Sequence, residues 1–116
     1  MNIETTKERL LQLNEEINLL SLTKNIQFHQ QTVVKKHMAL KGANGTLWIV
    51  PNQSSYDICL SGKLLVAEMT TFMRQLCGKD CSGYKQTKPI PHLPFWRVED
   101  YQIVRKAVFR FAGIHP

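Results

Sequence analysis

The residues best suited to chemistry are cysteines and a histidine in the second half of the chain. Cys77 and Cys81 are separated by three residues, and His92 follows them. Thiolates and imidazoles bind zinc, and a close cysteine pair on a glycine turn can place two sulfurs on one ion. A structural zinc site needs four ligands, however, and the sequence contains no second close pair. We therefore expect no metal and no cofactor, with the two thiols marking a helix end and a loop.

Catalytic signatures are weak elsewhere in the sequence. A cysteine nucleophile can meet a distant histidine in space, but no flanking motif marks one cysteine as reactive. Glu99 and Asp100 are neighbouring carboxylates, yet their position suits the positive end of a helix dipole better than general acid–base work. The stretch 42–45 lacks the Lys-Ser/Thr pair of a phosphate-binding loop and is typical of a hairpin turn. We predict no catalytic residues.

Positive charge is the most informative property of the sequence. The chain has 116 residues, with 15 lysines and arginines against 9 acids, for a net charge of +6. Residues 1–22 hold four of the acids and only two bases, so the rest of the chain is strongly basic. A positive body of this kind suits a polyanion or an acidic protein partner.

Candidate binding residues follow from this charge. Phosphate binding needs cations along one face, and base stacking needs exposed aromatic rings. Phe95 and Trp96 are aromatic candidates, although rings at such a place often anchor a loop to the core. The candidates for contact with nucleic acid or an acidic partner are the cations of the middle region, the following segment and the last helix, together with one tyrosine: Lys35, Lys36, Lys41, Lys85, Lys88, Arg97, Arg105, Lys106, Arg110 and Tyr84.

The element at the start of the chain is an amphipathic helix over residues 1–22. Leu10, Leu13, Ile17 and Leu20 recur at steps of three, four and three, which is helical spacing. This stripe packs either on the protein's own core or against its twin in a homodimer. In the second case the same four leucine and isoleucine residues form the dimer face.

The middle region, residues 24–60, is rich in β-branched and aromatic side chains. Glycine, asparagine and proline punctuate it as turn residues do. We predict an antiparallel meander with strands at about 32–40, 46–50 and 55–60. The stretch 35–41 could equally extend a short helix.

Helical spacing returns in the second half of the chain. Residues 62–77 form one helix, and 97–112 form another that Gly113 ends. Between them, residues 78–96 contain several prolines and glycines, which predicts a long loop.

Together these elements predict an α+β fold in a single domain, residues 1–116. It consists of an antiparallel three-stranded meander with an N-terminal helix and two C-terminal helices packed on it. No apolar run approaches the ~20 residues of a membrane span, so we expect no membrane association. The odd count of three cysteines fits a reducing compartment, which favours a cytoplasmic location.

For function the sequence supports two hypotheses. The first is a small basic, non-catalytic binding protein that acts on nucleic acid or in regulation. The alternative is a protein–protein interaction module, such as an inhibitor, adaptor or immunity-type protein. Such a module would dock on an acidic partner through its first helix or its proline-containing segment.

Overall fold

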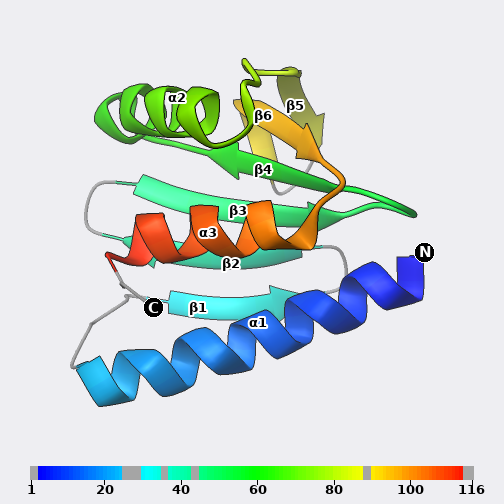
Figure 1. Cartoon of the computed structure of the whole chain (residues 1–116), viewed down its shortest axis with the longest axis vertical. Helices are drawn as coiled ribbons and strands as arrows, with labels where there is room; N and C mark the ends of the chain where they lie inside the picture. The colour runs from blue at the N-terminus through cyan, green and yellow to red at the C-terminus, as the bar shows by residue number, and fades with distance from the viewer. Residues whose placement is uncertain (1–2, 25–29, 35–36, 43–44, 88–89, 114–116) are drawn as a thin grey trace.

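The computed structural model describes residues 3–24, 30–34, 37–42, 45–87 and 90–113. The helices and strands follow one another along the chain in this order (Figure 1): α1 (Ile3–Lys24), β1 (Gln30–Val34), β2 (His37–Gly42), β3 (Gly45–Pro51), β4 (Tyr56–Leu60), α2 (Lys63–Cys77), β5 (Gly83–Thr87), β6 (Ile90–Val98) and α3 (Tyr101–Ala112). None of the helices in these ranges is long and apolar enough to cross a membrane.

The strands form one antiparallel sheet in the order β1-β2-β3-β4-β6-β5. After β4 the chain passes through α2, forms β5 at the far edge, and returns as β6 between β5 and β4. Strand β4 is therefore interior, with β3 on one side and β6 on the other.

The predicted α+β class, with one N-terminal and two C-terminal helices around an antiparallel sheet, is confirmed. The predicted count of three strands is wrong, because four strands lie between α1 and α2. The expected strand at 32–40 is in fact β1 and β2, which pair with Val34 opposite His37. The sequence between them contains no Gly, Pro, Asn or Asp, so it carries no turn signal.

The predicted loop at 78–96 is also wrong, since it contains β5 and most of β6. Pro91 and Pro94 lie inside β6. The half of β6 that contains them pairs only with β5, and pairing with β4 starts at Phe95. Proline has no amide donor, and it is tolerated where one side of a strand needs no ladder partner.

The last helix begins later than the predicted residue 97. Arg97 and Val98 complete β6, and the carboxylate of Asp100 caps α3 by accepting the backbone N–H of Gln102 at 2.9 Å. A side-chain acceptor at the N-cap satisfies one of the free amides of the first turn and fixes the start of the helix.

The three helices share one core with one face of the sheet. Figure 1 shows α3 in front of β2 and β3 and running along them, α1 beside β1, and α2 along the β4 side. Alternate strand residues such as Leu47, Ile49 and Ile58 are fully buried in this core with Met73 of α2 and Val108 of α3. Burial of these apolar side chains is the main force that holds the layers together.

Helix α1 lies on the protein's own core. Leu10, Leu13 and Ile17 are at most 1% exposed, and Leu20 packs against them as a partly buried neighbour. These four residues therefore pack on the protein's own core, and the alternative that they form a homodimer face stays a prediction. The large apolar side chains that α1 does expose are Leu11 and Leu19.

Candidate functional site

The face of the sheet opposite the helices is the candidate site. Side chains alternate between the two faces along each strand, and residues such as Leu47, Ile49 and Ile58 point toward the helices. We call the other face the open face. Its residues with described side chains are Ala39, Lys41, Thr46, Trp48, Val50, Asp57, Cys59, Leu93, Phe95 and Arg97.

The open face is unusually apolar. Antiparallel sheets with one solvated face normally place polar residues outward. Here Trp48, Val50, Leu93 and Phe95 stand outward and are only half-buried. Because these neighbouring apolar side chains keep part of their surface exposed, the open face is the candidate interaction surface.

Two aromatic rings lie in one row across the face. The register places Trp48 opposite Cys59, Cys59 opposite Phe95, and Phe95 opposite Gly83. Trp48 and Phe95 are thus two strands apart, about 10 Å at their Cα atoms. A side chain at Gly83 would bring its Cβ to 3.1 Å from the Phe95 ring, so the glycine gives this ring its space.

A bidentate ion pair lies beside the aromatic row. The Arg97 guanidinium donates to Asp57 through Nε to Oδ1 at 2.8 Å and through Nη2 to Oδ2 at 3.0 Å. The Asp57 side chain is fully buried, whereas that of Arg97 is 54% exposed. These hydrogen bonds raise the pKa of Arg97 above its usual value, so the group is always charged. The Arg97 guanidinium carbon lies 5.5 Å from the Phe95 ring centroid, within cation–π range.

The open face carries positive charge without an exposed acid. Asp57 is the only acid among the strand residues that the structure describes, and Arg97 neutralises it. Lys41 is exposed on the same face. At the edge, Lys79 donates from Nζ to the backbone carbonyl of Arg97 at 3.1 Å, and the neighbouring Asp80 is paired with Arg74.

The structure places some of the predicted binding residues on or near this face. Lys41 and Arg97 belong to it. Tyr84 and Lys85 lie in the edge strand β5, opposite Pro94 and Leu93 in the register. The other predicted residues of the middle and loop regions lie outside the described residues: Lys35, Lys36 and Lys88.

The three predicted cations of the last helix lie in the other layer, on α3. Arg105 binds Glu16 of α1 with a bidentate pair at 3.0 and 2.9 Å, and it stacks on Phe109 at 4.3 Å. Arg110 lies 5.6 Å from the ring centroid of Phe72, while Lys106 is exposed. Arg105 thus joins α3 to α1 through its ion pair with Glu16. The predicted binding residues therefore do not all lie on one surface.

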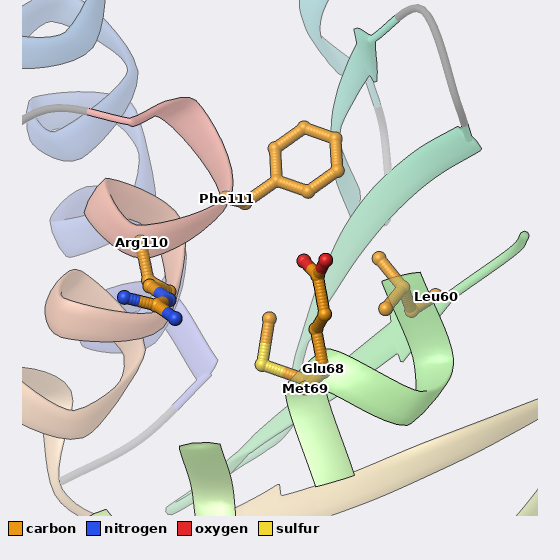
Figure 2. A pocket seen from close by; sticks show the side chains of 5 residues that line it. All are labelled: Leu60, Glu68, Met69, Arg110 and Phe111. Carbon is orange, nitrogen blue, oxygen red and sulfur yellow. The ribbon is translucent and has the colours of Figure 1, made fainter. Parts of the chain in front are cut away.

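A hollow lies between α2 and α3 (Figure 2). In Figure 2, Glu68 extends toward Phe111, and Arg110 lies on the α3 side; Leu60 and Met69 complete the lining. Its volume of about 50 Å³ is far below the ~300 Å³ of a typical ligand pocket. The hollow therefore gives no basis for a small-molecule site.

All three cysteines are reduced, and none of them forms a disulfide. Cys77 Sγ donates to the Met73 carbonyl at 3.3 Å, and Cys81 Sγ donates to the Gly83 carbonyl at 2.9 Å. Among the described side chains, no group of three or more His, Cys, Asp or Glu could hold a metal ion. The side chain of His92 is outside that set, so the absence of a metal stays a prediction.

Sequence reasoning missed Trp48 as a member of this row. Phe95 was an aromatic candidate for base stacking, but it was expected in a loop and not in a strand beside Trp48. The available signal was the apolar run 47–50, because in an antiparallel sheet such a run must place apolar side chains on both faces.

Comparisons with known proteins assign no family to this chain, so its function has to be argued from the chemistry of the open face. No family model, no curated protein and no solved structure matches the chain.

Proposed function

We propose that this protein is a non-catalytic binding protein that holds nucleic acid on its open face. The observation that carries the proposal is the charge of that face. The single acid among the described strand residues is buried under Arg97, and Lys41 stands exposed. A polyphosphate backbone is the complementary partner, because each cation that meets a phosphate releases condensed counterions.

The net charge of +6 supports the same partner at longer range. A positive surface raises the local concentration of a polyanion and its association rate. The acids of α1 lie across the sheet from the open face, so they do not oppose a polyanion there.

A protein-interaction module with an acidic partner is the second candidate. The apolar side chains of Trp48, Val50 and Phe95 favour it, since a protein surface could bury all three. The acidic rim of such a partner would then meet Lys41 and Arg97.

The test is the salt dependence of nucleic-acid affinity, measured on nuclease-treated protein with one matched pair of variants. Lys41→Gln removes a cation of the open face, and Lys106→Gln removes one from α3. Both residues are exposed, and each substitution removes one positive charge, so the two variants have the same net charge. We expect Lys41→Gln to weaken binding and to reduce the slope of log affinity against log salt by about 1. Lys106→Gln should bind as the wild type does.

Two results would contradict the proposal. If the wild type binds no DNA or RNA at low salt, the acidic-protein candidate replaces it. If both variants weaken binding equally, the effect is one of total charge, and the open face is not the site.

A further inference from the structure

We infer that the nucleic acid is single-stranded and that its bases stack on Trp48 and Phe95. This inference rests on the proposed function and names the form of nucleic acid that the open face accepts. Its basis is the aromatic row described above, in which two rings stand outward on a face that no described helix covers.

The two rings form a stacking platform. Both are half-buried, so each is held at its base by the sheet and keeps part of its surface open. The residue between them is Cys59, which is fully buried and has a small side chain. Base–aromatic stacking of this kind is the main affinity term in proteins that bind single strands, and any base can supply it.

Arg97 adds a fixed cation to the platform. Asp57 engages its Nε and Nη2 atoms, which leaves Nη1 without a bond to Asp57. Because the carboxylate holds the guanidinium in place, little side-chain entropy is lost when a phosphate binds. The 5.5 Å distance from Arg97 to the Phe95 ring places charge and ring within one nucleotide of each other.

A duplex does not fit this surface. Duplex recognition places a helix or a two-stranded ribbon in a groove. The exposed cations of α3, Lys106 and Arg110, lie in the helical layer, on the opposite side of the sheet from the rings. In a duplex the bases are stacked on one another, so Trp48 and Phe95 would have no base to contact.

A second copy of the chain does not fit either. Two open faces brought together would juxtapose the exposed Lys41 with the same residue of the partner, whereas Arg97 is already neutralised by Asp57. The described open face has no exposed acid to pair with Lys41. A single-stranded polyanion supplies both the negative charge and the flat rings that this face matches.

The experiment compares a short oligothymidylate with a duplex of similar length, for the wild type and three variants. We expect the wild type to prefer the single strand. Trp48→Ala should lose roughly 10- to 100-fold in single-strand affinity, and Trp48→Phe should recover most of it. Leu11→Ala, a truncation of an exposed apolar side chain on α1 and away from the open face, is the control and should bind within about twofold of the wild type.

Tryptophan fluorescence of the wild type tests the same contact without a substitution. The chain has two tryptophans, and Trp96 is fully buried. Stacking of a base on Trp48 should therefore quench the emission in proportion to the oligothymidylate bound.

Different results overturn the inference and the proposed function. Binding without quenching, equal affinity for duplex, or an unchanged Trp48→Ala would overturn single-strand stacking, while the proposed function stands. Absence of binding to every nucleic acid at low salt would overturn both. A dimer that Trp48→Ala dissociates would assign the face to a second copy instead.

Discussion

Tyr56 and Trp96 place two polar hydrogens inside the apolar core. The Tyr56 hydroxyl and the Trp96 indole nitrogen are buried, and neither has a hydrogen-bond partner among the described residues. Burial raises the pKa of the Tyr56 hydroxyl, and the nearby Arg9 of α1 offsets only part of that rise without meeting the geometry of a hydrogen bond. A buried polar group left unpaired costs about 1–3 kcal/mol.

The Tyr56 hydroxyl is therefore expected to oppose stability. Tyr56→Phe keeps the ring and removes the unpaired group, so the free energy of unfolding should rise by about 1 kcal/mol. Urea denaturation at neutral pH measures this change. A loss of stability instead would show that the hydroxyl has a solvent partner.

The same residue should make stability depend on pH in alkali. Burial raises the pKa values of Tyr56 and Tyr101 above the usual value of 10.0. Above about pH 10 the unfolded chain loses these protons first, so stability is complete below that pH and falls as pH rises toward the folded-state values. Tyr56→Phe should show a shallower fall than the wild type in urea titrations at successive alkaline pH values.

The Asp57–Arg97 pair should respond unequally to loss of either partner. Arg97→Met leaves the fully buried Asp57 carboxylate without its guanidinium, which should cost about 3 kcal/mol. Asp57→Asn leaves an arginine that is 54% exposed and can be hydrated, so it should cost less. Urea denaturation measures the free energy of unfolding of the two variants. Equal decreases would show that the burial of Asp57 and the exposure of Arg97 do not determine the cost.

Among the elements, α1 gives the sharpest test of the fold. Leu13 is fully buried on its inner side, and Leu19 is 66% exposed on its outer side. Leu13→Ala should lower the free energy of unfolding by about 3 kcal/mol through the cavity it leaves. Leu19→Ala should change it by less than about 0.5 kcal/mol. Similar effects at both positions would mean that α1 does not pack as described.

The helices were predictable from sequence because each has an apolar stripe of period 3.6. Helix α3 ends at Gly113, with φ of 70°, as the sequence predicts. Strands β5 and β6 were not predictable by the same reasoning. The prolines of β6 are tolerated because the half that contains them pairs only with β5. That pairing is set by the order of strands in the whole sheet, which the local sequence does not reveal.

The candidate site was predictable only in part, for a similar reason. Charge is visible residue by residue, so Lys41 and Arg97 were found. Which cations share a surface depends on the layer that each element occupies, and Arg105 proved to be bound to Glu16. Trp48 and Phe95 lie 47 positions apart in sequence, so only the strand order brings them into one row.

At the scale of the whole molecule, the acids are unevenly distributed between the two layers. The helices carry acids on α1 and α2, of which Glu16 is paired with Arg105 of α3, whereas the only acid of the described strands is the buried Asp57. This two-sided arrangement lets one side build the core while the other remains free to bind, which is common where a sheet carries helices on one face only.

The position of β6 in the sheet also constrains the order in which the chain can fold. Strands β1 to β4 pair with their sequence neighbours, whereas Asp57 and Arg97, which join β4 to β6, are 40 residues apart. Loop-closure entropy makes such a distant pairing slow compared with hairpin formation. Until β6 pairs, β4 is an edge strand whose backbone amides and apolar side chain Ile58 lack a neighbouring strand. A partly folded chain with such an exposed edge is prone to aggregate. Pairing of β6 with β4 thus covers the edge that the first four strands would otherwise expose.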